Sequence, residues 1–181
     1  MKKSLVVCLF LMIVAGFTAC GSASSEESQS TNPPVAIENP YGGPDVPLPG
    51  PTEPILKLIN GEITLSLSLD DLRGLPQVEA RVFEPFVKGE ISFKGVALDE
   101  LFRLVDIESD DNVLTVALND YTYSNFAREF VGTEAFLAYE QDGNAILMSL
   151  GGPIRIVVPN NKSLTESLEV WNWSLAEIRV E

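Results

Sequence analysis

The chain has no histidine, and its two cysteines both lie within the first 20 of its 181 residues. The absence of histidine excludes Ser-His-Asp and Cys-His catalytic sites, haem held by histidine, and the usual nitrogen and sulfur shells of zinc. Beyond Cys20 there is no thiol, so the rest of the chain can form neither an internal disulfide nor a redox-active thiolate. The remaining enzymatic options are carboxylate chemistry and oxygen-ligated metal.

Basic residues are also scarce. The sequence has 12 basic and 26 acidic residues, a formal net charge of −14. Removal of residues 1–19 would take away Lys2 and Lys3, leaving 10 basic residues and a net charge of −16. Such a field repels phosphate backbones and anionic headgroups, so we expect no nucleic-acid partner and no purely electrostatic membrane binding.

The N-terminus has the pattern of a signal peptide. Lys2 and Lys3 precede an apolar run from Leu5 to Phe17, and the small residues Thr18 and Ala19 follow. This run of 13 residues is shorter than the roughly 20 residues that a helix needs to cross a bilayer. We therefore expect residues 1–19 to be removed on export, rather than retained as a membrane anchor.

The end of this segment, Phe17-Thr18-Ala19-Cys20, resembles the lipobox of bacterial lipoproteins, although Phe17 stands where leucine is usual. The resemblance implies that Cys20 carries lipid and holds the protein on the extracytoplasmic face of a membrane. Gly21 implies sorting to the periplasmic side of the outer membrane in an organism with two membranes. The alternative is an ordinary cleavage site beside a coincidental cysteine.

A linker is predicted over residues 20–54. This stretch is rich in Ser, Glu, Gly and Pro, holds eight of the twelve prolines, and has no apolar periodicity that could build a core. Its closing prolines favour extended polyproline geometry. The predicted organisation is a signal peptide over 1–19, a lipidated linker over 20–54, and one domain over 55–181.

The domain is predicted to be β-rich α+β. Alternating apolar residues predict a half-buried strand that ends at Ser68, which is expected to cap a short helix stopped by Gly74. Gly95 is expected to end a strand before a helix, and Asp142-Gly143 is expected to turn a hairpin. The pattern of Tyr123–Phe130 is ambiguous, and a helical turn is one interpretation. The other predicted strands are Val78–Phe83, Glu90–Phe93, Val113–Leu118, Ala135–Glu140, Ala145–Ser149, Ile154–Val158 and Ser174–Val180, with a helix over Leu98–Val105.

One acidic stretch, Asp106–Asn112, alternates oxygen ligands like the start of a calcium loop. Asp111 stands where such a loop needs its turning glycine, and Ala117 stands where it needs its closing glutamate, which favours a solvated loop. A carboxylate pair for glycoside hydrolysis stays open, because no pair is singled out.

The second half carries a recognisable pattern: Leu137-Ala138-Tyr139, Asp142-Gly143, the run from Gly151 to Pro159, and Trp173 followed by Ile178 and Val180. It resembles the oxidoreductase molybdopterin-binding domain, the catalytic-domain fold of the sulfite oxidase family. Phe93–Leu101 and Asn119-Asp120-Tyr121 agree more loosely, so the resemblance covers nearly all of residues 55–181.

The resemblance also implies cofactor-binding features that this chain lacks. The family binds molybdenum through a cysteine in the stretch that corresponds to Phe83–Val87, which holds no cysteine. Catalytic members have a glycine-bearing loop and a Lys-Trp pair near the pterin phosphate, whereas this chain has Asn160–Leu164 and Asn172-Trp173. We therefore expect no catalytic or metal-ligating residue and no cofactor. Only the family resemblance suggests molybdopterin as a possible ligand.

Five residues occupy positions where the resemblance implies cofactor contact: Tyr121, Tyr139, Gly152, Arg155 and Trp173. Arg155 offers forked donors to an anion, but it could equally face solvent or pair with a carboxylate. The three aromatic residues could instead fill the core, and Gly152 could serve a turn.

Three functions are compatible with these features. The first, which we favour, is a non-catalytic lipoprotein module that binds a small ligand or a periplasmic or membrane protein partner through the old cofactor surface. The second is a molybdopterin-dependent oxidoreductase with atypical metal ligation. The third is a carboxylate-dependent hydrolase.

Overall fold

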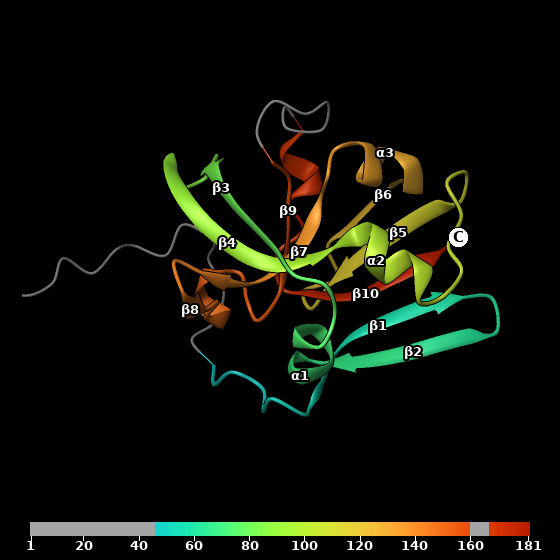
Figure 1. Ribbon diagram of the computed structural model, residues 1–181, viewed down its shortest axis with the longest axis horizontal. Coiled ribbons are helices and arrows are strands. Elements are labelled where there is room, and N and C mark those ends of the chain that lie inside the picture. Colours follow the sequence, from blue (N-terminus) through green and yellow to red (C-terminus); the bar gives the residue numbers. More distant parts are fainter. Residues whose placement is uncertain (1–45, 160–166) are drawn as a thin grey trace, which may run out of the picture. The chain divides into compact units, whose positions relative to one another are not determined.

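The computed structural model describes residues 46–159 and 167–181. The predicted signal peptide, Cys20, most of the predicted linker and the loop Asn160–Leu164 lie outside these residues. Two five-stranded sheets form the architecture (Figure 1).

The first sheet has the order β2-β1-β10-β5-β6. β1 pairs in parallel with β10, and every other pair in the sheet is antiparallel. The C-terminal strand therefore lies at the centre of this sheet, beside the first strand of the domain. Its strands are β1 (Pro54–Asn60), β2 (Ile63–Ser68), β5 (Asn112–Ala117), β6 (Thr122–Phe126) and β10 (Leu175–Val180).

The second sheet is antiparallel and has the order β3-β4-β7-β8, with β9 also pairing with β7. Residues 136–139 of β7 are all buried, as expected of a strand covered on both faces. Residues 151–158, which include β9, are buried without interruption. The strands are β3 (Val78–Glu84), β4 (Gly89–Ala97), β7 (Phe136–Gln141), β8 (Asn144–Ala145) and β9 (Arg155–Val157).

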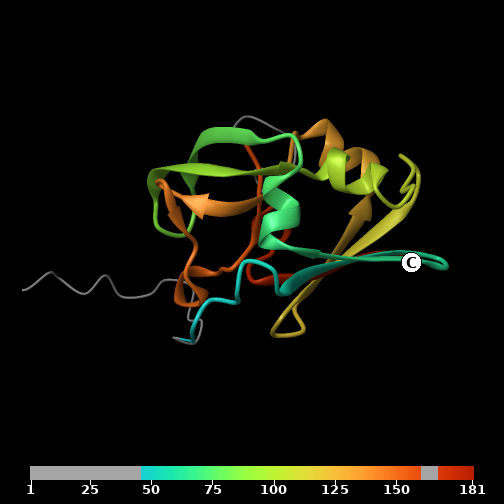
Figure 2. The same cartoon turned by 60° about the horizontal axis from the view of Figure 1, so that its bottom comes forward.

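Short helices connect these strands, and one hydrophobic core draws residues from both sheets. Figure 2 shows that α1 follows β2 and leads the chain towards β3, so that it links the two sheets. No helix within residues 46–159 or 167–181 is long and apolar enough to span a membrane. The helical elements are α1 (Leu69–Arg73), α2 (Leu98–Arg103), α3 (Ala127–Gly132), η1 (Met148–Leu150) and η3 (Leu168–Val170).

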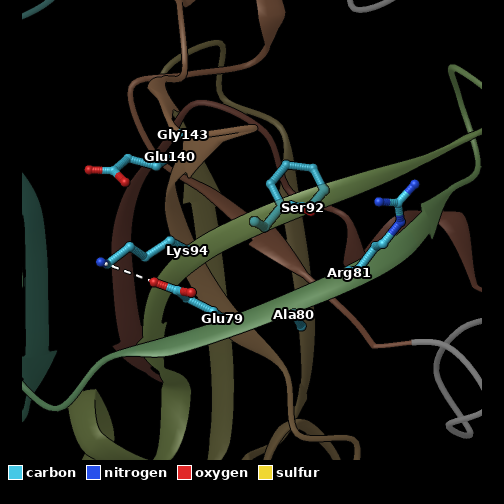
Figure 3. A pocket seen from close by; sticks show the side chains of 8 residues that line it. Glu79, Ala80, Arg81, Ser92, Lys94, Glu140 and Gly143 are labelled. Atoms are coloured by element: carbon cyan, nitrogen blue, oxygen red, sulfur yellow. Dashed lines mark ion pairs between the residues drawn. The ribbon is translucent and has the colours of Figure 1, made fainter.

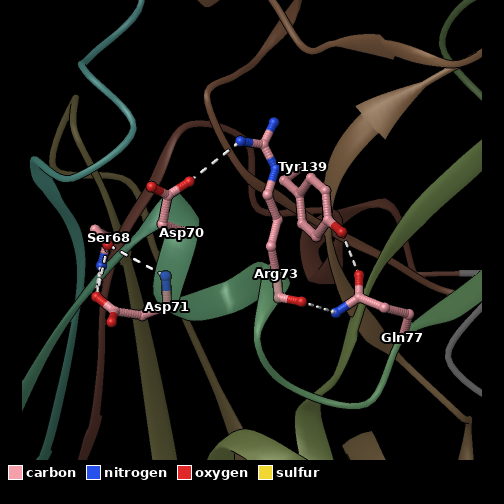
Figure 4. Close-up of polar contacts among 6 residues, drawn as sticks. All are labelled: Ser68, Asp70, Asp71, Arg73, Gln77 and Tyr139. Carbon is pink, nitrogen blue, oxygen red and sulfur yellow. Dashed lines mark hydrogen bonds and ion pairs between the residues drawn. The ribbon is translucent and has the colours of Figure 1, made fainter.

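Ser68 caps α1 as the sequence predicts. Its hydroxyl accepts a hydrogen bond from the Asp71 backbone N–H at 3.2 Å, and the Asp71 carboxylate accepts one from the Ser68 backbone N–H at 2.8 Å (Figure 4). The hydrogen bond from the Ser68 side chain, followed by that from its backbone, holds the pKa of Asp71 below its ordinary value. This capping box satisfies N–H groups that a helix start would leave open.

The prediction for Gly95 is wrong. β4 continues through Gly95 to Ala97, with a register shift against β7 between Lys94 and Gly95. A Cβ atom at this position would overlap the backbone of Leu137. The glycine permits close approach of a neighbouring strand, rather than ending its own.

The predicted second strand of the hairpin, Ala145–Ser149, is also mostly wrong. β8 comprises only two residues, and η1 follows. The Leu147 carbonyl accepts hydrogen bonds from the N–H groups of Leu150 at 2.8 Å and Gly152 at 2.9 Å. These bonds turn the chain back before a longer strand can form. The predicted β-rich α+β class is confirmed.

Candidate ligand-binding site

A pocket of about 370 Å³ lies where several connecting segments meet. We call it the aromatic pocket, because four of its seven lining side chains are aromatic. Its volume falls within the range of small-molecule sites, which are typically lined by apolar and aromatic side chains with few polar groups. The lining residues are Phe86, Asn119, Tyr121, Leu168, Glu169, Trp171 and Trp173.

Backbone hydrogen bonds hold the walls of the aromatic pocket together. The β5–β6 connection turns through Asp120, which has a φ of +64°, a conformation that aspartate tolerates better than most residues. The Leu118 N–H donates to the Ser174 carbonyl at 2.8 Å, and the Ser174 N–H donates to the Gly151 carbonyl at 2.7 Å. The Tyr121 hydroxyl donates to the Glu169 carbonyl at 3.0 Å.

The rings of the pocket also contact one another. Phe86 and Trp173 form an edge-to-face pair with a centroid distance of 4.2 Å and an interplanar angle of 77°, a favourable aromatic geometry. Gly151 lies beneath Trp173, because a Cβ atom at Gly151 would be 3.1 Å from the Trp173 Cβ. Glycine at this position therefore lets the indole lie against the backbone.

Arg155 lies beside the two tryptophans and is fully buried (0 % exposed). Its guanidinium carbon is 5.2 Å from the ring centroid of Trp173, 5.8 Å from that of Trp171 and 5.6 Å from that of Phe93. Its Nη2 donates to Glu84 Oε1 at 2.8 Å, and Glu84 is also fully buried. Of the alternatives that the sequence left open for Arg155, the structure places it in a carboxylate pair.

The same glutamate organises the turn between β3 and β4. Glu84 Oε2 accepts hydrogen bonds from the backbone N–H groups of Phe86 at 2.8 Å and Val87 at 2.7 Å. Both carboxylate oxygens are therefore engaged, one by Arg155 and one by the backbone. This arrangement fixes Phe86 at the edge of the aromatic pocket.

Asn172 points into the core between the two pocket tryptophans. It is fully buried, and its amide donates to the Thr115 hydroxyl at 3.0 Å. The backbone carbonyl of Asn172 accepts a hydrogen bond from the Ile156 N–H at 2.9 Å. At the position where the resemblance implies a lysine, this chain has a short uncharged side chain directed away from solvent.

Tyr139 does not line the aromatic pocket. It is a buried residue of β7 whose hydroxyl donates to Gln77 Oε1, with the Arg73 guanidinium 5.8 Å from its ring centroid (Figure 4). Burial raises the pKa of the Tyr139 hydroxyl, with the nearby Glu140 charge adding to the effect. Here the aromatic side chain serves the core and its edge.

The structure thus separates the five residues named from the sequence. Tyr121 and Trp173 line the aromatic pocket, Arg155 packs on its tryptophans, and Gly152 lies in the adjoining backbone turn. The sequence reasoning did not single out Phe86, Trp171, Glu169 or Glu84. The spacing of Trp171 and Trp173, two residues apart, was the available signal for a shared aromatic surface.

A second pocket, of about 350 Å³, lies over the face of β3 and β4. Figure 3 shows Lys94 directed at Glu79, with Nζ and Oε1 3.1 Å apart. The hydrogen bond to Glu79 and its charge raise the pKa of Lys94. Similarly, Arg81 Nε lies 3.8 Å from Glu90 Oε2. Glu79, Arg81 and Lys94 of this pocket pair across neighbouring strands and are not buried, so the pocket offers a ligand little fixed geometry.

The acidic stretch Asp106–Asn112 has local partners. Asp110 pairs with Arg128 at 2.6 Å, and the Asp111 carboxylate accepts from the Glu108 N–H at 2.8 Å. Within residues 46–159 and 167–181, no group of three or more acidic side chains is placed to hold a metal ion.

The chain is similar to a known protein family and to solved structures. The family model described as oxidoreductase molybdopterin binding domain matches residues 56–166. Among solved structures, the fold is similar to the sulfane dehydrogenase SoxCD from Paracoccus pantotrophus, with a TM-score of 0.59 and 17 % identity. That match covers 75 % of this chain and 40 % of the SoxCD chain, so this chain spans less than half of its length. A search of curated proteins gave no match.

Proposed function

Because this chain belongs to the oxidoreductase molybdopterin binding domain family, we propose that it is a non-catalytic member of that family, tethered to a membrane by lipid. In this proposal the aromatic pocket binds a small ligand in place of the cofactor. The observation that carries the proposal is the buried ion pair between Arg155 and Glu84. Glu84 lies in the stretch where the resemblance implies a metal-binding cysteine.

The residues present do not fit a molybdenum cofactor bound in the family's way. Beyond Cys20 the chain has no thiol, and the soft ligand that the family uses is a thiolate. Glu84 is no substitute, because both of its carboxylate oxygens are taken by Arg155 and by the backbone of Phe86 and Val87. Asn172 adds no charge that could hold a phosphate, and it is buried.

The molybdenum content of the purified protein tests whether the cofactor has been lost. We expect full-length protein purified from a host that makes molybdopterin to contain molybdenum far below one atom per chain. A family member with the cysteine ligand, produced in the same host, is the positive control for cofactor supply. Stoichiometric molybdenum would overturn the proposal and favour an oxidoreductase with atypical metal ligation.

The lipid tether has its own test, because the chain offers a matched pair of cysteines. Replacing Cys20 with alanine should move the protein from the membrane fraction to the soluble extracytoplasmic fraction, since this removes the acylated sulfur. The Cys8→Ala variant changes the same residue type within the predicted signal peptide and should stay membrane-bound. The tether is contradicted if the Cys20→Ala protein remains in the membrane fraction.

A further inference from the structure

The aromatic pocket combines ring faces with a single carboxylate, and we propose that it binds an organic cation of the alkylammonium class. This inference rests on the proposed binding function and names the ligand class for that pocket.

Four rings from three separate segments converge on the aromatic pocket. Phe86 comes from the β3–β4 turn, Tyr121 from the β5–β6 connection, and Trp171 and Trp173 from the segment before β10. An ammonium group near the face of an aromatic ring is attracted by the ring quadrupole, and several rings around one cation form the aromatic cages that recognise quaternary ammonium. The hydrogen bond that the Phe86 N–H donates to Glu84, and the one that the Tyr121 hydroxyl donates to the Glu169 carbonyl, hold this arrangement before a ligand arrives.

The charge of the pocket favours a cation over an anion. Among the lining residues that the structure describes, Glu169 is the one carboxylate, and none is lysine or arginine. Burial, followed by the negative charge of Glu169, raises the pKa of the Tyr121 hydroxyl, which is consistent with a negative potential at that point. The whole chain adds a formal net charge of −14, which attracts cations at long range.

Arg155 does not offer a positive charge to a ligand in the aromatic pocket. Its side chain has no exposed surface, and its charge is compensated by Glu84 at 2.8 Å. A ligand in the aromatic pocket therefore meets indole and phenyl rings, with the buried ion pair behind them. An anionic ligand would find Asn119 and Glu169 at the rim, and neither offers a positive charge.

Intrinsic fluorescence is a direct test, because both tryptophans of the chain line this pocket. The full-length protein is titrated with choline, and separately with the uncharged analogue in which carbon replaces the quaternary nitrogen. Choline should change the tryptophan emission in a saturable way, with the neutral analogue binding about tenfold more weakly. That loss corresponds to about 1.4 kcal/mol, which lies within the range of cation–π attraction at a partly desolvated site. Equal binding of both compounds, or no saturable change with choline, would overturn the assignment of a cation.

A charge variant gives a second readout that does not depend on refolding the core. Glu169→Gln should weaken choline binding by about threefold, or about 0.6 kcal/mol, which lies within the range for an exposed charge. Glu62→Gln, a matched change at the exposed β1–β2 turn, should leave binding unchanged. Equal effects of the two variants would show that choline senses only the overall charge, and would overturn the site. Absence of choline binding in molybdenum-free protein would refute the ligand class while leaving the loss of the cofactor standing.

Discussion

Replacing Glu84 with alanine is expected to lower the free energy of unfolding by about 3–5 kcal/mol. Removing one partner of a buried ion pair leaves the other charge buried without its compensation, and this cost exceeds the net value of the pair itself. Here the change also removes the acceptor for the backbone N–H groups of Phe86 and Val87. Urea denaturation followed by tryptophan fluorescence measures the loss.

Glu79→Ala is the matched control for this variant. Glu79 lies on the same strand, β3, and pairs with Lys94 at 3.1 Å, but its side chain is 70 % exposed. An exposed pair of this kind is worth about 0–1 kcal/mol. If Glu84→Ala costs no more than Glu79→Ala, the buried pair does not organise this region. A double variant, Glu84→Ala with Arg155→Met, should cost less than the two single changes added together, because they share one interaction.

The second large effect is expected at Gly152. A Cβ atom there would overlap the carbonyl oxygen of Ile146 and lie 2.9 Å from that of Leu147. Both obstacles are backbone atoms, so no rotamer change relieves them. Gly152→Ala should therefore cost about 3 kcal/mol, at the upper end of the usual range for overpacking, measured as a lowered unfolding midpoint in urea.

Gly89→Ala controls for the general effect of adding a methyl group to a glycine. Gly89 opens β4, and a Cβ atom there meets no atom within 4 Å. Its change in stability should be small, because a glycine-to-alanine change without steric conflict mainly reduces the freedom of the unfolded chain. A Gly152→Ala protein as stable as Gly89→Ala would contradict the close packing of this turn.

Local sequence signals predicted much of the fold. Ser68 and Asp71 predicted the start of α1, because a capping box depends only on two residues three positions apart in the sequence. The run of mostly apolar residues from Val113 to Leu118 predicted a strand, and β5 spans Asn112–Ala117. Asp142-Gly143 marked the turn after β7, as such dipeptides do in hairpins.

Contacts between distant segments account for the errors. Gly95 was predicted to end a strand because the contact that requires glycine there, with the backbone of Leu137, comes from another strand. β8 is shorter than predicted because the Gly152 N–H donates a hydrogen bond to the Leu147 carbonyl, and hydrophobic periodicity cannot predict that contact.

The candidate site was predicted in part for the same reason. Tyr121 and Trp173 were found through the family resemblance, and both line the aromatic pocket. Arg155 was named, but its partner Glu84 is 71 residues away in sequence and carried no local signal of burial. Phe86 and Trp171 were missed because an aromatic residue in a small domain more often fills the core than a pocket.

We propose that this domain keeps the family's fold and has given up its cofactor. Native mass spectrometry of the folded, full-length protein, purified from a host that makes molybdopterin, would detect a bound cofactor. We expect the mass of the processed polypeptide with its lipid and without molybdopterin. An added mass matching a molybdopterin, with or without its metal, that is lost on denaturation would contradict it.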